Sequence, residues 1–570
     1  MKKFLRFTFV LSVSLLLSSC FEAKNQGSSS SVPSSSTIVP TSSEEPSISP
    51  SPASSEEPSS PVSESSSSES SESLPSSTSS SSVVPSERTV TFYAMNDFHG
   101  AVKQNMSNDE PGILSLGSFL KEKGTQENTL LINSGDMFQG AIESNYNRGK
   151  LLTDCLNSIE FDSFALGNHE FDWGQEAIRQ NKLRSAESDG YQTPWLCANV
   201  YDYDQERQRD GTTQQSDLGG LYSIRTLENG LKIGIIGAIG LGQWTSICSS
   251  YVDDIVFKDP IPIIKSLSDE LRGSHNCDLV VLSFHADQEE ALGTGLTDIS
   301  PVSNEKYVDA VFCAHSHQLE DSLENGVVFT QNHAYGRDIS KLTLTLDSNN
   351  DVTDSDLETF TSDEIVRLVG NDYDSELKSL VDSYGEESQQ AANEILGTLS
   401  GGTMSRYSNL PNMLATAMLE AAQKEGYSPA LAMVNSARKN LYYGDITYGE
   451  IYECFPFDNE VYMIECDGAD ILNEASYDSN VIARAEENAI EAGKTYQIAV
   501  IDYLAVHKST KRVYDYFPSM KVTAKVGEKE GHHYRDILAD YIRGKKTIYS
   551  SDYSSNLWKY DCDQLSQTKS

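Results

Sequence analysis

The chain has 570 residues, which is too long for one hydrophobic core, so we expect more than one domain. Its formal net charge is −41 at pH 7, and most of the acidic excess lies beyond residue 88. A surface of this sign repels nucleic-acid phosphates, so stable binding to DNA or RNA is not expected. Small anionic substrates remain compatible with this charge, because metal ions in a cleft can invert the local field.

The first 20 residues predict an export signal. Lys2, Lys3 and Arg6 precede the apolar run 7–17, which is too short to span a bilayer as a mature helix. The run closes on Leu-Ser-Ser-Cys, which resembles a bacterial lipobox with Cys20 as the lipidated first residue of the mature protein. An ordinary cleaved signal peptide is the alternative. No later run approaches 18 apolar residues, so an N-terminal lipid is the only membrane attachment expected, on an exported, cell-surface protein.

Residues 21–88 are mostly Ser, Pro and Glu, with almost no aromatic or branched apolar residues. Such a segment cannot offset the entropy of ordering, and we interpret it as a disordered tether. As a flexible coil it would reach roughly 45–50 Å on average. The alternative is a spacer whose length is not under selection.

Besides Cys20, eight cysteines occur without a C-x-x-C pair, and several lie in apolar runs. Buried free thiols are the interpretation for most of them, in spite of the exported location. One disulfide within the C-terminal part stays open as an alternative.

Residues 89–365 alternate strand-like and helical patterns, which predicts an α/β fold of layered elements. Two later strand-like runs, 327–330 and 341–346, have no helix between them, so we expect mixed β-sheets. Helical spacing over residues 366–395 predicts a linking helix. Residues 396–546 are predicted to form a second α/β domain, and residues 547–570 are expected to be a tail. The strands expected up to residue 313 are 90–95, 129–132, 232–239, 279–284 and 310–313, and the helices are 113–123, 150–158 and 262–271.

Five apolar runs each end in residues that can bind metals. Five of the ten histidines lie in these motifs, which makes coincidence a poor explanation, although each residue taken singly would more often be a cap, a turn or a surface group. Carboxylates, an amide and imidazoles suit divalent ions such as Mn²⁺, Zn²⁺, Fe²⁺ or Mg²⁺. The set exceeds the needs of one ion and fits two, with Asp136 as the shared carboxylate; such a pair catalyses in-line attack of a bridging hydroxide on phosphorus. The candidate ligands are Asp97, His99, Asp136, Asn168, His285, His315 and His317.

The motifs D-F-H-G, G-D-M-F-Q-G, G-N-H-E-F-D, the lone strand-end His285 and A-H-S-H resemble, in order and spacing, the five blocks of the calcineurin-like metallophosphoesterases. The forms N-D-F-H-G and G-N-H-E-F-D resemble the 5′-nucleotidase family. This resemblance covers about residues 89–545. Ala314 stands where the family commonly has glycine, a change that we expect to be tolerated.

The resemblance implies a role for each matching residue. His169 would stabilise or protonate the phosphate in the transition state, oriented by Asp172. The ligands of the first metal would be Asp97, His99, Asp136 and His317, and those of the second Asp136, Asn168, His285 and His315.

In the second domain the resemblance implies a substrate site. Arg406 and Arg438 match family arginines and suit phosphate oxygens. Phe457 matches one of two aromatics that sandwich the nucleobase, and Tyr503 falls where the second would be; core packing is the alternative for both. The family's G-G-D-G, whose aspartate holds ribose hydroxyls, is absent after Ala505, where residues 506–509 read V-H-K-S. The resemblance therefore does not predict that the site selects nucleosides.

These observations predict an exported, lipid-anchored, two-domain, two-metal phosphoesterase acting on a small phosphorylated substrate, expected to be a nucleotide. The family further implies a domain rotation about residues 361–396. A cyclic-nucleotide phosphodiesterase or UDP-sugar pyrophosphatase using the same metals is the second hypothesis. A surface protein that binds nucleotides without turnover is the third, and a purely structural wall protein fits least. The native metals, the leaving group and the oligomeric state are left open by these residues.

Overall fold

The computed structural model describes residues 88–202, 215–248, 251–252, 254–475, 480–484, 490–505, 516–527 and 533–553. The predicted signal with Cys20, the tether up to residue 87, the segment 506–509, and residues 554–570 of the tail with Cys562 lie outside the described residues. Among the described residues, no helix combines the length and the apolar character needed to cross a bilayer.

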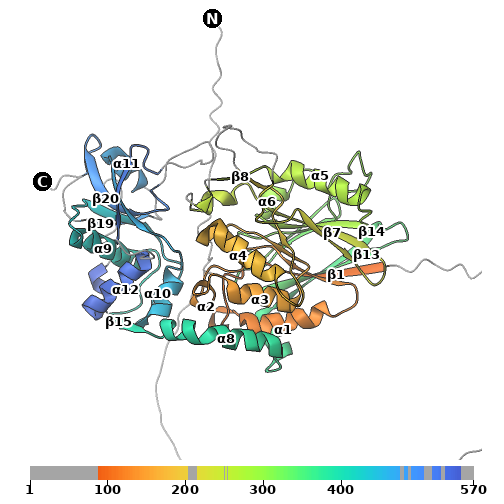
Figure 1. The fold of residues 1–570 in the computed structure, drawn as a ribbon, viewed down its shortest axis with the longest axis horizontal. Coiled ribbons are helices and arrows are strands. Elements are labelled where there is room, and N and C mark those ends of the chain that lie inside the picture. Colours follow the sequence, from red (N-terminus) through yellow and green to blue (C-terminus); the bar gives the residue numbers. More distant parts are fainter. Residues whose placement is uncertain are drawn as a thin grey trace, which may run out of the picture. The chain divides into compact units, whose positions relative to one another are not determined.

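Two six-stranded mixed sheets form the N-terminal half of the described chain (Figure 1). Neighbouring strands from β1 to β4 are parallel in the first sheet, and β7, β9, β10 and β12 are parallel in the second. In order across the first sheet the strands are β14 (Val352–Thr361), β13 (Asp338–Leu346), β1 (Arg88–Met95), β2 (Thr129–Asn133), β3 (Ser163–Ala165) and β4 (Trp195–Leu196). Across the second they are β11 (Glu320–Glu324), β12 (Val327–Gln331), β10 (Ala310–Phe312), β9 (Leu279–His285), β7 (Lys232–Ile239) and β6 (Tyr222–Thr226).

The alternation of side chains along β1 explains how the two sheets pack. Val90, Phe92 and Ala94 belong to the core between the sheets, where the Phe92 ring centroid lies 5.5 Å from that of Phe312. Tyr93 and Met95 point to the opposite face, into a core shared with helices. The result is a sandwich of two sheets with helices on its outer faces, as predicted for a layered α/β domain.

The three helices predicted for this half are present, and three further helices among the described residues were not predicted. All eight elements that we expected up to residue 313 are present, with ends within two residues of the predicted ones. A short two-stranded sheet of β5 (Val200–Asp202) and β8 (Ile255–Phe257) is added. The predicted helices are α1 (Gly112–Gly124), α3 (Lys150–Ile159) and α5 (Pro260–Gly273), and the further ones are α2 (Ile142–Asn145), α4 (Gly174–Ala186) and α6 (Gln288–Ala291).

The predicted single linking helix is two helices, α7 (Ser362–Val369) and α8 (Ser375–Ala392). Gly370 ends α7 with φ of +59°, a conformation that L residues rarely adopt. The Asp374 carboxylate then starts α8 by accepting the backbone N–H groups of Glu376 and Leu377, each at 3.0 Å. Helix α8 packs against α1, α2 and α3 and also against α10 of the C-terminal half.

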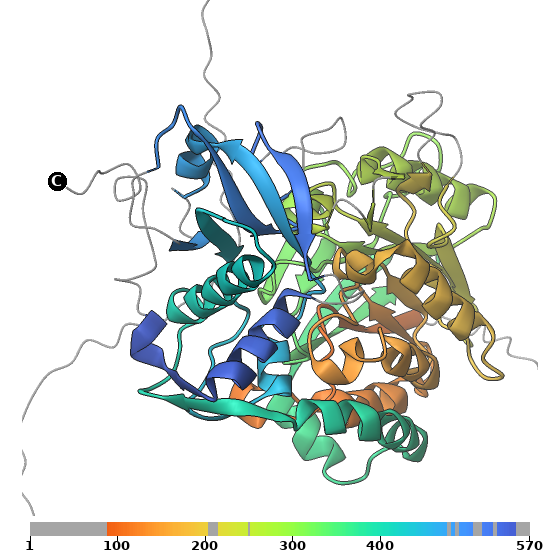
Figure 2. The same ribbon diagram turned by 60° about the vertical axis from the view of Figure 1, so that its left-hand side comes forward.

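The C-terminal half has its own hydrophobic core, formed by residues 396–553. Helices α9 and α12 pack against each other, and α9 also packs on β16, β19 and β20 (Figure 2). Part of the predicted tail is built into this core, because β22 pairs with β15 and Tyr553 is buried. The helices are α9 (Asn409–Lys424), α10 (Tyr448–Cys454), α11 (Gly468–Glu474) and α12 (Tyr534–Lys545). The strands, in order across two sheets, are β17 (Gly444–Thr447), β15 (Ile395–Ser400) and β22 (Thr547–Tyr549), then β19 (Asn480–Arg484), β16 (Leu431–Asn435), β20 (Thr495–Ile501), β18 (Val461–Asp467) and β21 (Lys521–Val526).

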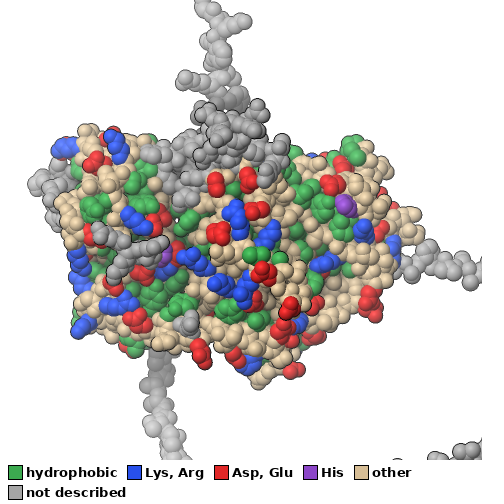
Figure 3. Space-filling model, viewed as in Figure 1, with side chains coloured by type: hydrophobic (Ala, Val, Ile, Leu, Met, Phe, Trp, Pro, Cys, Tyr) green, Lys and Arg blue, Asp and Glu red, His purple; other side chains and the backbone are tan. Residues whose placement is uncertain are grey.

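The seven described cysteines are all buried free thiols, as predicted for most of them. Acidic and basic side chains are interspersed on the face shown in Figure 3. The domain limits that we drew from the sequence remain predictions.

Candidate active site

All seven predicted metal ligands lie at the carboxyl ends of strands in the two packed sheets. Asp97 and His99 follow β1, Asp136 follows β2, and Asn168 follows β3. From the second sheet, His285 ends β9, and the other two histidines follow β10. Five of the seven have a left-handed backbone, which costs free energy for residues other than glycine and is concentrated at functional sites. These five are Asp97, His99, Asp136, His315 and His317.

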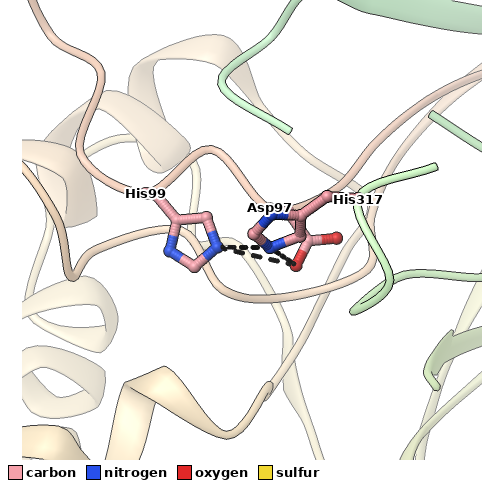
Figure 4. Close-up of side chains that lie close together, drawn as sticks. All are labelled: Asp97, His99 and His317. Carbon is pink, nitrogen blue, oxygen red and sulfur yellow. Dashed lines mark hydrogen bonds and ion pairs between the residues drawn. The ribbon is translucent and has the colours of Figure 1, made fainter. Parts of the chain in front are cut away.

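The first group consists of Asp97, His99 and His317 (Figure 4). The His99 Nε2 and His317 Nε2 atoms are 2.9 Å apart, and Asp97 Oδ1 lies 3.7 Å from the former and 3.4 Å from the latter. His99 Nδ1 donates a hydrogen bond of 3.0 Å to the Gln139 carbonyl, which leaves Nε2 as a free lone pair directed at the group.

The second group consists of Asp136, His285 and His315. Asp136 Oδ2 lies 3.3 Å from His285 Nε2, and His285 Nδ1 lies 2.8 Å from the Ser134 carbonyl, to which it donates. Asn168 Oδ1 joins them, at 3.1 Å from His285 Nε2 and 3.0 Å from His315 Nδ1. Asp136 Oδ2 is also 3.9 Å from His99 Nε2, so this carboxylate lies between the two groups, as expected for a shared ligand.

Two carboxylate oxygens at the centre of this cluster are buried without a hydrogen-bond partner among the described residues: Asp97 Oδ1 and Asp136 Oδ2. The other oxygen of each carboxylate is well bonded, because Asp97 Oδ2 accepts from Asn96 Nδ2 at 2.7 Å and Asp136 Oδ1 accepts from the His169 N–H at 2.8 Å. A buried anionic oxygen without a partner is costly unless a cation faces it. The donor set therefore fits bound divalent ions.

The pKa values of two of the ligand histidines agree with this fit. Burial, reinforced by neighbouring His317, lowers the pKa of His99 well below its ordinary value. Burial together with His285 lowers the pKa of His315 to about 4. Both rings are neutral at pH 7, which is the form of imidazole that binds a metal. In a third ligand histidine, His285, burial lowers the pKa, but Asp136 and Asp97 outweigh burial and raise it to about 10.

Two residues of the G-N-H-E-F-D motif hold the ligand loops together without being ligands. A Cβ on Gly167 would lie 2.2 Å from Asp136 Oδ1, so the close approach of the two loops requires glycine here. The buried Glu170 carboxylate accepts the N–H groups of Gly167 at 2.7 Å, Asp136 at 2.9 Å and Met137 at 2.8 Å. Sequence reasoning gave Glu170 no role, and only its place inside the motif pointed to one.

His169 and Asp172 form the pair that the resemblance implied. His169 Nδ1 lies 2.7 Å from Asp172 Oδ2, and its Nε2 lies 4.0 Å from Asp136 Oδ2. Burial lowers the pKa of His169, but Asp172 and Asp136 outweigh burial and raise this pKa above its ordinary value. The imidazole is thus fixed by the Asp172 carboxylate, with its Nε2 facing the Asp136 carboxylate of the cluster.

Two of the four predicted substrate residues contact this histidine from the C-terminal half. Arg438 Nη2 lies 3.2 Å from His169 Nε2, and the Phe457 ring stacks on the His169 ring with centroids 5.7 Å apart. Arg406, the third of these residues, contacts Arg438 instead of His169: its Nη1 donates to the Arg438 carbonyl at 2.9 Å. It supports the loop that carries Arg438.

The loops that carry Phe457 and Tyr503 are connected by hydrogen bonds that the sequence did not predict. Asn459 Nδ2 donates to Asp502 Oδ1 at 2.6 Å, and the same oxygen accepts the Tyr503 N–H at 2.8 Å. The buried Arg535 on α12 donates to the carbonyls of Pro456 and Phe457 and to the Asp458 carboxylate. No motif identified Arg535; a lone arginine in an apolar helix pattern was the available signal.

Both halves of the chain match known protein families. Residues 90–319 match the family of calcineurin-like phosphoesterases, and residues 391–475 match the 5′-nucleotidase C-terminal domain. The endonuclease YhcR of Bacillus subtilis is 25% identical over 405 residues, covering 66% of this chain but only 32% of that protein. A 5′-nucleotidase of Vibrio parahaemolyticus is 23% identical over 439 residues, covering 67% of this chain and 73% of that protein. In fold, the chain resembles a 5′-nucleotidase precursor from Thermus thermophilus, with a TM-score of 0.63 at 18% identity over 81% of this chain and 97% of that one.

The fold, the strand-end ligand cluster and these matches define a calcineurin-like metallophosphoesterase, a class of metal-dependent phosphoester hydrolases. Within that class, the chain belongs to the 5′-nucleotidase family, because the C-terminal domain of that family follows the phosphoesterase segment.

Proposed function

We propose that the chain is an exported two-metal phosphoesterase that hydrolyses phosphate esters of nucleotides. The observation that carries this proposal is the pair of buried, unpartnered oxygens, Asp97 Oδ1 and Asp136 Oδ2, facing the imidazoles of His99, His285 and His317. The first ion would be held by Asp97, His99, Asp136 and His317, and the second by Asp136, Asn168, His285 and His315.

Bound divalent ions would supply Lewis-acid stabilisation of the phosphoryl oxygens and activation of the attacking water. The protein's own contribution comes from two groups beside the cluster, Arg438 and His169. The Arg438 fork donates to phosphate oxygens, for which its planar geometry is suited. His169, held by Asp172, donates from Nε2 where negative charge develops as the ester bond breaks.

The C-terminal half would present the leaving group. Phe457 lies beside His169 and Arg438, with the Arg438 guanidinium 5.0 Å from its ring centroid, so an aromatic base could bind where these side chains now meet. Arg406 supports Arg438, and Tyr503 is held next to the Phe457 loop through Asp502 and Asn459. A nucleotide is the substrate class that this set fits best.

Replacement of His169 by alanine tests the proposal. We expect the variant to bind as much Mn²⁺ as the wild type, since His169 is outside both ligand sets, and kcat on p-nitrophenyl phosphate to fall roughly 10²–10⁴-fold. Wild-type turnover should be abolished by a chelator and restored by Mn²⁺ or Zn²⁺. Undiminished hydrolysis by the His169→Ala protein would remove His169 from the mechanism, and turnover that resists the chelator would refute a metal-dependent enzyme.

A second candidate is a phosphodiesterase or pyrophosphatase at the same site, since one relative is an endonuclease by name. AMP, cyclic nucleotides and UDP-glucose, compared under equal metal loading, separate the two. The lipid anchor at Cys20 remains part of the proposal, and the mass of the mature N-terminal peptide tests it.

A further inference from the structure

A cavity of about 260 Å³ adjoins the candidate active site. It is next to His99 and Arg438, and both halves of the chain contribute to its wall. Cavities that hold drug-sized ligands measure about 300–1,000 Å³, so this one suits a group of a single ring. Its polar lining includes Gln139, Glu110, Glu143, Glu453, Lys103 and Lys439.

Gln139 is the first sign that the cavity takes a ligand. Its side chain is almost fully buried, with the residue 1% exposed, and Nε2 has no hydrogen-bond partner among the described residues. A buried donor left unpaired costs about 1–3 kcal/mol. The Gln139 carbonyl accepts from His99 Nδ1, so the residue joins the cavity wall to the ligand cluster.

Apart from Arg438, which the proposed function assigns to the phosphoryl group at the metal cluster, the lysines and glutamates that line the cavity are paired with one another. Lys103 Nζ lies 2.5 Å from Glu143, and Lys439 Nζ lies 3.5 Å from Glu453 and 3.9 Å from the buried Glu110. A further phosphate would meet three carboxylates and no free lysine. An apolar group would leave the buried Gln139 Nε2 without a partner.

Tyr335 forms another part of the wall in a strained conformation. Its φ is +68°, rare for a bulky residue, and its N–H donates to the Asp97 carbonyl at 2.8 Å. This places the ring 5.6 Å from the His99 ring by centroid and beside the cavity. Strain of this kind, roughly 1–3 kcal/mol, persists where a functional geometry is over-determined by its surroundings.

We propose that this cavity, which we call the Gln139 cavity, binds a compact, uncharged, hydroxyl-rich ring esterified to the phosphoryl group at the metal cluster, that is, the sugar of a sugar phosphate. Hydroxyl groups both donate and accept, so they pair with glutamate oxygens, the lysine ammonium groups and the free Gln139 amide together. The inference rests on the proposed phosphoesterase function and goes beyond its nucleotide substrate, because it adds sugar phosphates as a second substrate class for that site.

The test compares kcat/KM for glucose 1-phosphate, inorganic pyrophosphate and p-nitrophenyl phosphate. In Gln139→Leu and Glu453→Gln we expect the ratio of glucose 1-phosphate to p-nitrophenyl phosphate to fall at least tenfold. The matched controls are Gln180→Leu and Glu122→Gln, which change exposed side chains on α4 and α1 and should keep the ratio within twofold.

The inference is overturned if the ratio of kcat/KM for glucose 1-phosphate to that for p-nitrophenyl phosphate is unchanged in both cavity variants. It is also overturned if the wild type prefers pyrophosphate to glucose 1-phosphate. Either result leaves the phosphoesterase function standing. If the wild type hydrolyses neither ester, the phosphoesterase function itself fails. Calorimetric titration with glucose 1-phosphate then tests ligand binding in the Gln139 cavity without turnover. Binding that is at least tenfold weaker in Gln139→Leu than in the wild type supports the inference, and unchanged or absent binding overturns it.

Discussion

At the scale of single residues, the site could be predicted where chemistry and position coincide. Asp97, Asp136 and Asn168 stand directly after apolar strands, and such residues from neighbouring parallel strands meet at one edge. The family resemblance assigned Arg438 to phosphate oxygens and Phe457 to the nucleobase, and the structure puts both side chains against His169. The resemblance also assigned Arg406 to the substrate, and this assignment stays a prediction; in the structure the Arg406 side chain donates to the Arg438 carbonyl.

Positioning residues such as Glu170 and Arg535 could not be predicted in their roles, because their partners are backbone groups on other loops. Three N–H groups converge on Glu170, and two carbonyls accept from Arg535. A sequence shows which side chains are available but not which main-chain atoms a loop leaves unpaired.

Arg535 gives a prediction at this scale. Arg535→Met leaves the Asp458 carboxylate without its cation in a buried place, and breaking such a pair costs roughly 3–5 kcal/mol. We expect a lower urea midpoint and, because the Phe457 loop loosens, a raised KM for AMP. Arg543→Met on the same helix is the control, since its partners Glu394 and Asp540 are exposed and such pairs contribute about 0–1 kcal/mol. Equal stability losses in the two variants would contradict the role given to Arg535.

At the scale of helices and strands, periodicity predicted the elements well and their breaks poorly. The strands β1 and β7 and the helices α1 and α3 carry strong apolar patterns, and their ends agree with the expected ones. The region of the linking helix keeps helical spacing across residues 370–374, so periodicity alone does not show the break. Local caps at Gly370 and Asp374 decide it.

The start of α7 allows a direct measurement of such a cap. Thr361 Oγ1 accepts the Glu364 N–H at 3.4 Å, and Glu364 Oε2 accepts the Thr361 N–H at 3.0 Å, which forms a capping box. Thr361→Ala should lower the unfolding free energy by about 0.5–2 kcal/mol, while Thr361→Ser keeps the hydroxyl and should stay close to the wild type. Urea denaturation measures both, and equal values for the two variants would show that the box is not stabilising.

At the scale of the whole molecule, the halves meet at the candidate active site. Besides Arg438 and His169, Asn145 Nδ2 on α2 donates to the Pro456 carbonyl at 3.1 Å, and Ile142 shares a small core with Tyr452 of α10. A phosphoryl group cannot enter between Arg438 and His169 while their nitrogens are 3.2 Å apart. The proposed binding of the phosphoryl group between these two side chains would therefore require the halves, or the Arg438 side chain, to move.

A disulfide between cysteines introduced at Ile142 and Tyr452 distinguishes these two motions. If the halves must separate, the oxidised protein should lose most of its turnover and regain it with dithiothreitol, whereas each single-cysteine variant should respond to neither treatment. Full turnover in the oxidised protein would assign the movement to the Arg438 side chain alone.

In the proposed function, loop residues from two packed sheets hold two divalent ions around the shared Asp136 carboxylate. Equilibrium dialysis with Mn²⁺ measures the number of ions bound per chain. We predict two tightly bound ions for the wild type and for His169→Ala, and a loss of both sites in Asp136→Ala. One ion or none in the wild type, or two ions retained without Asp136, would contradict the account.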